Sequence, residues 1–405
     1  MGDPRLLGAV WGAELILALW GWRVAQFYGR RMPRVAARPL AEIFPNVAVI
    51  VPIKGVDEHT ADNIESLLQQ SYPNYRLIFA VESADDTVCT LLARIAPSRA
   101  AGKVQVVVAG PATWRGQKVH NQLAAIARTS SQDQILAFMD ADAHPHSDWL
   151  HALVLPLTYG PHIGATTGYR FYVPVSDHPA NGVACVSNAM VGGLFGPYRR
   201  TVAWGGSMAL RRDDFFSYGI HDAWQGALSD DYVLSYCVKK KAHAKIHFVP
   251  RCLVASPALF DWRSLHEFAV RQYRITRICA MRLWLTALAG ALLYLFTLMS
   301  SFGTALFDLL TGRPGWWMPA GVFILLYTLS ILRGAALMLA GKRLLNDHWL
   351  SIRRAGFWFT LGFPAVQFIT LYYLLCAALG NQITWRGIRY RMSNRTHTRV
   401  VSNHA

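Results

Sequence analysis

The sequence predicts an α/β domain held between apolar helices long enough to enter a membrane. From about residue 45 to residue 277, short apolar runs alternate with polar helical segments, which is the pattern of an α/β layered domain. Before and after this region lie apolar stretches about as long as a bilayer is thick. A chain of 405 residues has room for one such domain and a membrane region, so we expect a single active or binding site.

The composition also indicates a membrane region. Hydrophobic residues make up 53% of the chain and charged residues only 16%, an apolar excess that a soluble surface does not normally carry. The net charge of +16 suits nucleic acid, an anionic lipid surface or phosphorylated substrates. Basic residues cluster beside the apolar stretches, at 30–34, 342–343, 353–354 and 386–399, which favours a membrane and argues against nucleic acid.

The first apolar stretch, residues 6–28, is predicted to be an anchor. No small-residue cleavage site follows it, which argues against a signal peptide, and the basic run after it places that end in the cytoplasm. Three more apolar stretches follow at about 283–307, 316–339 and 357–379. If all three crossed, the α/β domain and the basic tail would lie on opposite sides, so we expect one to be re-entrant or interfacial. The last is our choice because of Gly362-Phe363-Pro364.

These patterns predict an integral membrane protein with a cytoplasmic catalytic domain, in the inner membrane if the source is bacterial. The expected parts are an anchor at 1–32, a catalytic domain at 45–260, an amphipathic interfacial helix at 261–282, transmembrane or re-entrant helices at 283–380 and a basic cytoplasmic tail at 381–405. The six cysteines form no CxxC pair, which fits a reducing compartment and argues against structural zinc.

Within the α/β region, β-rich runs predict strands at 47–53, 77–81, 104–108 and 135–139. Helical segments are expected between them, at 61–70, 87–95 and 117–128. In such a sheet, ligands bind at the carboxyl ends of the strands. The residues directly after each strand are therefore the candidates for chemistry.

Two carboxylates, Asp140 and Asp142, follow the fourth predicted strand with a single alanine between them. At a strand end this spacing lets both acids face one Mg²⁺ or Mn²⁺, which can also bind substrate phosphates. An acidic loop or a helix N-cap is the simpler interpretation of the same pattern.

A second acidic pair, Asp230 and Asp231, opens a predicted helix. Ser229 or Asp230 can cap that helix, which leaves a carboxylate free to act as a general base. Further along, Arg271 and Arg274 fall on one face of the amphipathic helix, where they could meet a diphosphate or a lipid phosphate. A basic stretch beside a membrane is more often only an anchor.

Weaker candidates follow the first two strands. Pro52 and Lys54 follow the first, where a nucleotide base and ribose could lie, and Glu82, Ser83 and Asp85 follow the second. Lys118 lies on the third predicted helix. Ordinary surface polarity explains each of them equally well.

Taken in order, these segments resemble the ceramide glucosyltransferase family, one of the inverting, membrane-anchored GT-A glycosyltransferases. The resemblance spans most of the chain and rests on PIKGVD at 52–57, NIES at 63–66, YPNY at 72–75, VESADD at 81–86, KVHN at 118–121, DAD at 140–142, GGSM at 205–208, DDY at 230–232 and ITWRGIRYR at 383–391. It implies a GT-A domain, the nucleotide-diphospho-sugar transferase fold, with a UDP-sugar donor and a membrane lipid acceptor.

The resemblance also implies roles for individual residues. Asp140 and Asp142 would be the metal-binding DxD, with Asp140 also at the donor, and Asp231 would be the base. Arg271 and Arg274 would match an RxxRW motif that contacts the donor diphosphate. Two positions depart from the family pattern: Ile275 replaces the tryptophan, and Ser83 stands where an aspartate is expected, which leaves Glu82 or Asp85 for that contact.

The expected reaction is therefore inverting transfer of a hexose from a UDP-sugar to a primary hydroxyl of ceramide, and glucose is the expected hexose. Other acceptors stay open: a hopanoid, diacylglycerol, a polyprenyl phosphate or a polysaccharide, the last disfavoured by the few apolar stretches. A non-catalytic membrane scaffold that keeps the fold is the alternative from another class.

Overall fold

The α/β domain is built on one mixed, seven-stranded sheet with the strand order β3-β2-β1-β4-β6-β5-β7. The computed structural model describes residues 4–99, 103–196 and 201–403. The strands are β1 (Val47–Pro52), β2 (Tyr75–Val81), β3 (Val104–Val108), β4 (Ile135–Met139), β5 (Ile163–Pro174), β6 (Ser207–Arg211) and β7 (Lys245–Ala258). The first four are parallel, β6 runs antiparallel to both β4 and β5, and β5 and β7 are parallel. The four strands expected from the sequence all form.

Helices cover both faces of the sheet, because the central strands bury the side chains on both sides. In β1, Val47, Val49 and Val51 face α2 (Thr60–Leu68), α3 (Thr87–Arg99) and α5 (Trp149–Tyr159), whereas Ala48 and Ile50 face the other layer. That layer holds α4 (Gln117–Ile126), α7 (Arg212–Ser217), α8 (Ile220–Trp224) and α9 (Asp230–Tyr236), which continues into a π-helical turn, η1 (Cys237–Lys241). Alternation with a period of two sends neighbouring residues to opposite layers.

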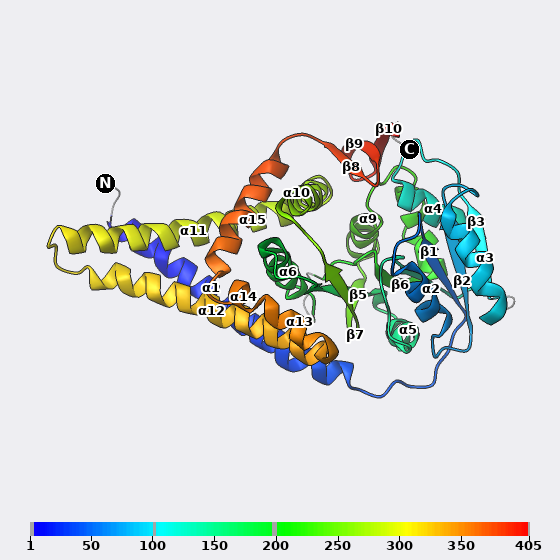
Figure 1. The fold of residues 1–405 in the computed structure, drawn as a ribbon, viewed down its shortest axis with the longest axis horizontal. Coiled ribbons are helices and arrows are strands. Elements are labelled where there is room, and N and C mark those ends of the chain that lie inside the picture. Colours follow the sequence, from blue (N-terminus) through cyan, green and yellow to red (C-terminus); the bar gives the residue numbers. More distant parts are fainter. Residues whose placement is uncertain (1–3, 100–102, 197–200, 404–405) are drawn as a thin grey trace.

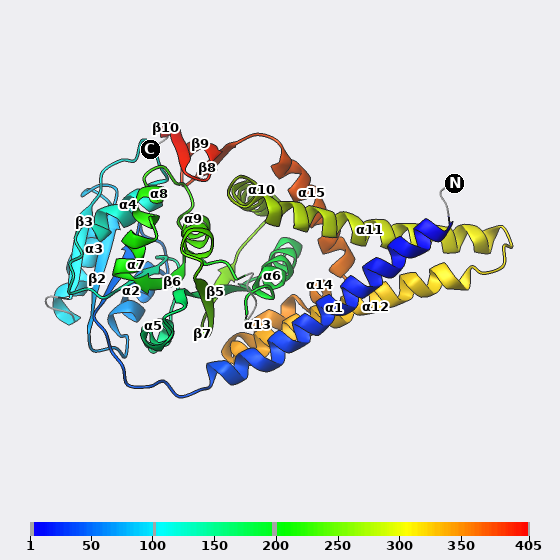
Figure 2. The same ribbon diagram turned by 180° about the vertical axis from the view of Figure 1, so that it is seen from behind.

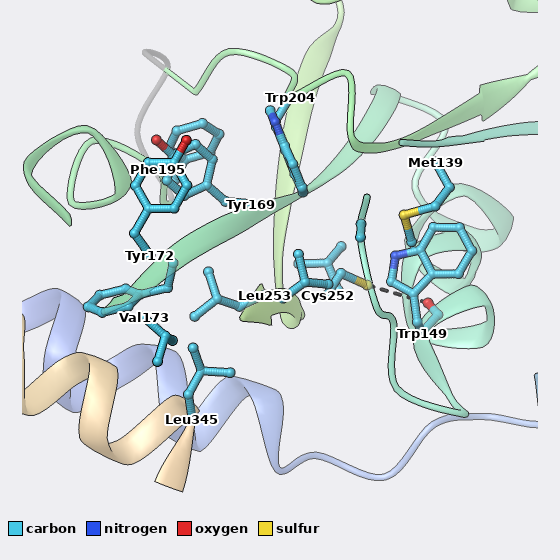
Figure 3. Packing of buried hydrophobic residues seen from close by; sticks show 14 of the residues in the cluster. Met139, Trp149, Tyr169, Tyr172, Val173, Phe195, Trp204, Cys252, Leu253 and Leu345 are labelled. Carbon is cyan, nitrogen blue, oxygen red and sulfur yellow. Dashed lines mark hydrogen bonds between the residues drawn. The ribbon is translucent and has the colours of Figure 1, made fainter. Parts of the chain in front are cut away.

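The edge strand β7 and its neighbour β5 are long enough to reach the membrane helices (Figure 1). α6 (Pro179–Gly192) packs on this extension. Tyr169, Tyr172, Val173 and Leu253 of the two strands belong to one buried cluster that also includes Leu345, which follows a membrane helix (Figure 3). The sheet and the membrane region therefore share a continuous hydrophobic core.

Three helices in the described part of the chain are long and apolar enough to cross a membrane: α1 (Pro4–Ala36), α11 (Met281–Leu310) and α12 (Trp317–Leu344). They extend together away from the sheet, and both views place the N-terminus and the α11–α12 turn at the far end (Figures 1 and 2). The sheet and the C-terminus therefore lie at the same end of this helical bundle.

The fourth apolar stretch does not form one continuous helix. It is broken into η2 (Asn346–His348), α13 (Trp349–Arg354), α14 (Gly356–Phe359) and α15 (Phe363–Ala378). The turn between α14 and α15 packs on α12, where Tyr327 Oη donates a hydrogen bond of 2.9 Å to the carbonyl of Leu361. Pro364 is tolerated in the first turn of α15 because its missing N–H has no partner there. The break falls at the expected Gly362-Phe363-Pro364 segment, and the re-entrant placement of this stretch stays a prediction.

The expected amphipathic helix is α10 (Trp262–Cys279), which begins with a capping box at Asp261. The basic tail, for which the sequence predicted no secondary structure, folds into an antiparallel sheet of β8 (Gln382–Trp385), β9 (Ile388–Asn394) and β10 (His397–Asn403). In β9, Ile388, Tyr390 and Met392 are buried while the residues between them are exposed. This alternation docks the tail against α9 and α10, since the buried side chains form one cluster with residues of both elements.

Candidate active site

A largely buried lysine, with 15% of its side chain exposed, joins the two acidic motifs. Lys118 of α4 places its Nζ 2.7 Å from Asp140 Oδ1 and 2.9 Å from Asp230 Oδ2, and donates to the carbonyl of Gly205 at 3.3 Å. Burial disfavours the ammonium, but the two carboxylates outweigh burial and raise the pKa of Lys118 above its ordinary value. Segments more than 100 residues apart in sequence therefore meet at one charged centre, at the carboxyl end of β4.

Asp140 follows the last residue of β4, and its backbone N–H donates to the carbonyl of Gly206 at 3.3 Å. Burial alone would raise its pKa, yet Lys118 and then Arg170 hold the pKa of Asp140 below the usual range. Asp142, two residues on, keeps 51% of its side chain exposed. One carboxylate is thus fixed by the protein and the other stands open to a ligand.

Asp230 faces inward. Its carboxylate accepts from Gln122 Nε2 at 2.9 Å in addition to Lys118, and its side chain is only 5% exposed. A Cβ on Gly205 would come within 2.6 Å of Asp230 Oδ2 and 2.8 Å of Lys118 Nζ. The absence of a side chain at Gly205 is therefore what lets this network close.

Asp231, the second acid of the pair, lies beside Gly205. Its Oδ1 accepts from Ser229 Oγ and, at 2.7 Å, from the N–H of Tyr232, while Oδ2 has a longer contact of 3.4 Å with the N–H of Gly205. Ser229 is the N-cap of α9, as one of the two sequence interpretations proposed. Burial and then the neighbouring Asp230 raise the pKa of Asp231 to about 6.

An arginine that the sequence motifs did not mark, Arg170 of β5, lies beside the DxD carboxylates. Its guanidinium is 4.0 Å from Asp140 Oδ2 and 4.0 Å from Asp142 Oδ2. It also lies over the rings of Trp204, at 4.9 Å, and Tyr172, at 5.7 Å. Nothing in strand periodicity distinguishes such an arginine, and only the pairing of β5 into the sheet brings it here.

Within the described ranges, no group of three or more His, Cys, Asp or Glu side chains converges as a metal site would. Asp140 and Asp142 together supply two hard carboxylate ligands. Magnesium and manganese at phosphate-transferring sites commonly use one or two carboxylates and take the remaining oxygens from the substrate. The residues therefore fit such an ion as half of a site that the substrate phosphates would complete.

The residues after β1 and β2 form the rim of the site. Pro52 is the last residue of β1, Lys54 Nζ lies 2.8 Å from Glu82 Oε2, and the carbonyl of Lys54 accepts from Arg386 Nη1 at 2.8 Å. Glu82 is thus partly buried and paired with Lys54, whereas Ser83 and Asp85 are exposed.

Arg386 links the C-terminal sheet to this site, and its charge contributes to holding down the pKa of Asp140. It lies in the β8–β9 turn with a positive φ of 47°, followed by Gly387 at 79°. Such a conformation is uncommon for a residue with a side chain. The motif at 383–391 was visible in the sequence, but its place beside Lys54 was not.

The two arginines of α10 have different surroundings. Arg271 lies over the Phe268 ring at 5.5 Å and contacts the carbonyl of Thr384 at 3.5 Å. Arg274 donates to the carbonyls of Gln382, at 2.8 Å, and Cys376, at 3.2 Å. Arg274 thus ties α10 to the segment between α15 and β8, while Arg271 lies one turn earlier in α10.

The mixed sheet, with paired carboxylates at its carboxyl edge, defines a glycosyltransferase of the GT-A class that uses a nucleotide-sugar donor. The chain belongs to glycosyl transferase family 21, whose sequence model matches residues 14–398. This confirms the predicted ceramide glucosyltransferase family and its GT-A fold.

Solved structures with a similar fold share little sequence with this chain. Mannosyltransferase PcManGT from Pyrobaculum calidifontis, in complex with GDP-Man and Mn²⁺, is 17% identical with a TM-score of 0.47, over 92% of this chain and 97% of that one. GalNAc-T7 with UDP, GalNAc and Mn²⁺ is 15% identical with a TM-score of 0.43, over 59% of this chain and 48% of that one.

Glucosyl-3-phosphoglycerate synthase from Mycobacterium tuberculosis, with Mn²⁺, UDP and glucosyl-3-phosphoglycerate, is 16% identical with a TM-score of 0.37, over 61% of this chain and 81% of that one. All three of these glycosyltransferases were solved with Mn²⁺. At these identities, the likeness concerns the fold and not the sugar or the acceptor.

Proposed function

We propose that this protein transfers a hexose, glucose in the first instance, from a UDP-sugar to the primary hydroxyl of a membrane lipid, with ceramide as the preferred acceptor. The observation that carries the proposal is the meeting of Asp140, Asp231 and Lys118 at the carboxyl edge of the sheet. α10 connects this domain directly to the first of the two later membrane helices. A soluble donor and a lipid acceptor can meet between these two parts.

Asp231 is the general base in this proposal. As the lipid oxygen bonds to the anomeric carbon, the carboxylate takes the hydroxyl proton, and the bond between that carbon and the diphosphate oxygen breaks. UDP leaves with the electron pair, and the configuration at the anomeric carbon inverts. A pKa of about 6 suits this role, because the group is mostly ionised near pH 7 and still has appreciable basicity.

Asp140 and Asp142 would hold Mg²⁺ or Mn²⁺ together with donor phosphate oxygens, and the ion when bound would neutralise charge on the departing diphosphate. Lys118 fixes the Asp140 carboxylate in place, and Asp230 fixes Lys118. We assign Asp230 this positioning role within the catalytic set, because its carboxylate is already shared between Lys118 and Gln122.

The donor nucleoside is proposed to lie over the ends of β1 and β2. Pro52, Lys54 and Glu82 would form its floor, and Ser83 or Asp85 would contact it from the exposed rim. Arg271 is proposed to contact the donor diphosphate from α10. Arg274 is proposed to act indirectly, since its guanidinium binds the segment that connects α15 to the C-terminal sheet.

The membrane arrangement extends the proposal. Three crossing helices would leave the catalytic domain and the C-terminal sheet on one side, and the basic clusters support the cytoplasm as that side. The lipid hydroxyl would then reach Asp231 from the cytoplasmic leaflet.

The test is mass spectrometry of lipids from a host that makes the protein, fed with labelled UDP-glucose and ceramide, beside hosts that make Asp140→Ala or Asp213→Ala. Asp213 is a matched control because its side chain is 98% exposed and lies at the opposite end of β6. Labelled glucosylceramide should appear with wild type and Asp213→Ala and be lost with Asp140→Ala. A labelled hopanoid, diacylglycerol, polyprenyl phosphate or polysaccharide would replace ceramide as the acceptor, and absence of any labelled product and any UDP release would favour a scaffold.

A further inference from the structure

The guanidinium of Arg170 is held within the site by two aromatic rings. Trp204 and Tyr172, both drawn in Figure 3, are buried, and both backbones are fixed by hydrogen bonds. The Trp204 N–H donates to Thr167 Oγ1 at 2.9 Å, and the Tyr172 N–H donates to Asn188 Oδ1 at 3.0 Å. A guanidinium lying over fixed aromatic faces loses little further freedom on binding a ligand.

This arginine also has donors to spare. Its side chain is 22% exposed, and among residues 4–99, 103–196 and 201–403 no acceptor lies within hydrogen-bonding distance of its guanidinium. Asp140 and Asp142 attract it at 4.0 Å, which is longer than a hydrogen bond. The group is therefore oriented by charge and rings, while its N–H donors remain available to a third partner.

The nearby charges indicate what that partner is. Asp140 Oδ1 is taken by Lys118, so Arg170 faces Asp140 Oδ2 and the exposed Asp142. A divalent ion on these two aspartates would neutralise the same negative charge that the guanidinium now neutralises. A diphosphate that arrives with the ion presents oxygens that suit a planar, multidentate cation.

We propose that Arg170 is a built-in cation of the DxD pair, which competes with the divalent ion for Asp140 and Asp142 and hydrogen-bonds the diphosphate of the bound donor. The inference rests on the proposed function. It assigns to a residue of β5, outside all the motifs, a share of the charge neutralisation that the DxD motif assigns to the metal. Removing Arg170 should then strengthen metal binding and weaken nucleotide binding, two effects of opposite sign.

The test uses the full-length protein in lipid nanodiscs. Binding of Mn²⁺ alone is measured from the electron paramagnetic resonance signal of the free ion, and binding of UDP in EDTA is measured by calorimetry. Arg170→Met should bind Mn²⁺ several-fold more tightly and bind UDP in EDTA about tenfold more weakly, the weight of one hydrogen bond to a charged group. Arg170→Lys keeps the charge, so its Mn²⁺ affinity should stay near wild type while UDP binding falls part of the way.

Arg212→Met is the matched control, because Arg212 also lies over a ring, that of Phe216, and near an aspartate, Asp213. Arg212 directly follows β6, at the end of that strand away from the site. Both of its affinities should match wild type. Parallel losses of Mn²⁺ and UDP binding in Arg170→Met, or no change in either, would overturn the inference, and Arg170→Lys decides if the methionine variant does not fold. Wild-type protein that binds UDP neither with Mn²⁺ nor in EDTA would instead count against the proposed function.

Discussion

The ammonium of Lys118 and the carboxylate of Asp140 lie 2.7 Å apart, in a position where Lys118 also neutralises Asp230. Lys118→Met should therefore leave two largely buried carboxylates without their cation and lower the free energy of unfolding by about 3 kcal/mol. Thermal unfolding of the purified protein measures this. Arg263→Met removes an exposed i,i+4 partner of Glu267 and should change stability by less than about 0.5 kcal/mol. Equal effects of the two variants would contradict the central role of Lys118.

Asp231→Asn should reduce the rate of sugar transfer by roughly 10²- to 10⁴-fold, the usual contribution of a general base. The wild-type rate at saturating substrate should rise with pH through about 6 and then level off, because the carboxyl group must lose its proton before it can accept one. The variant should lack this rise. Measuring initial rates from roughly two units below that pKa to two units above it tests both. An unchanged pH profile in the variant would assign the base elsewhere.

Asp231→Asn, although it should lower the rate of transfer, should raise the stability of the protein above about pH 6. A carboxyl group whose pKa is raised on folding contributes stability below the pKa of the unfolded chain, near 4, and loses that contribution as the pH rises through about 6. Asp231→Asn should therefore be more stable than wild type at pH 8 by roughly 2–3 kcal/mol, the weight of a shift of about two pKa units, and equal to it near pH 4. Thermal unfolding at the two pH values measures the difference, and a variant less stable at pH 8 than at pH 4, relative to wild type, would refute it.

Gly205→Ala should disrupt the charged centre, because the new Cβ would lie 2.6 Å from Asp230 Oδ2 and 2.8 Å from Lys118 Nζ. Neither buried group has room to move without breaking the other contact, so transfer activity should fall at least about tenfold and stability by about 1–3 kcal/mol. Gly290→Ala in α11 is the control, since no described atom outside the adjoining helix backbone lies within 4 Å of its added Cβ. Activity that survives Gly205→Ala intact would show that the network tolerates expansion.

Arg271→Met and Arg274→Met should separate donor binding from anchoring. Because Arg274 holds the carbonyls of Cys376 and Gln382, its loss should expose the segment between α15 and β8 to limited proteolysis. Arg271→Met should leave that segment protected and instead raise the KM for the UDP-sugar. Peptide mapping after brief proteolysis, together with donor titrations, distinguishes the two; identical behaviour would mean that both arginines serve one purpose.

The three long helices predict a membrane topology. Reporter proteins fused at the N-terminus and inserted in the turn after α11 should report the side opposite to a reporter at the C-terminus. The same turn carries Gly312 and Gly315, both at positive φ, and tolerates insertion more readily than a helix does. A C-terminal reporter on the same side as the α11–α12 turn would require a further complete crossing by residues 346–378.

The sequence alone predicted the first half of the sheet, since β1, β2, β3 and β4 are short β-rich runs that end in polar residues. It also located the two acidic motifs and the apolar stretches, because local composition determines where a chain can be a buried strand or a membrane helix. The second half of the sheet was not predicted in detail. β5 is held by pairing with β6 and β7, and local sequence patterns do not predict such pairing between distant segments.

Only the tertiary structure decided how the charged residues are shared. The sequence marked Asp230 and Asp231 as a pair, but the fold turns one toward Lys118 and holds the other beside Gly205. It likewise brings Arg170 to the DxD carboxylates and folds the basic tail into a sheet against the site. The physical reason is that propensity and hydrophobic periodicity act over a few residues, whereas electrostatic pairing depends on distances set by strand order and helix packing.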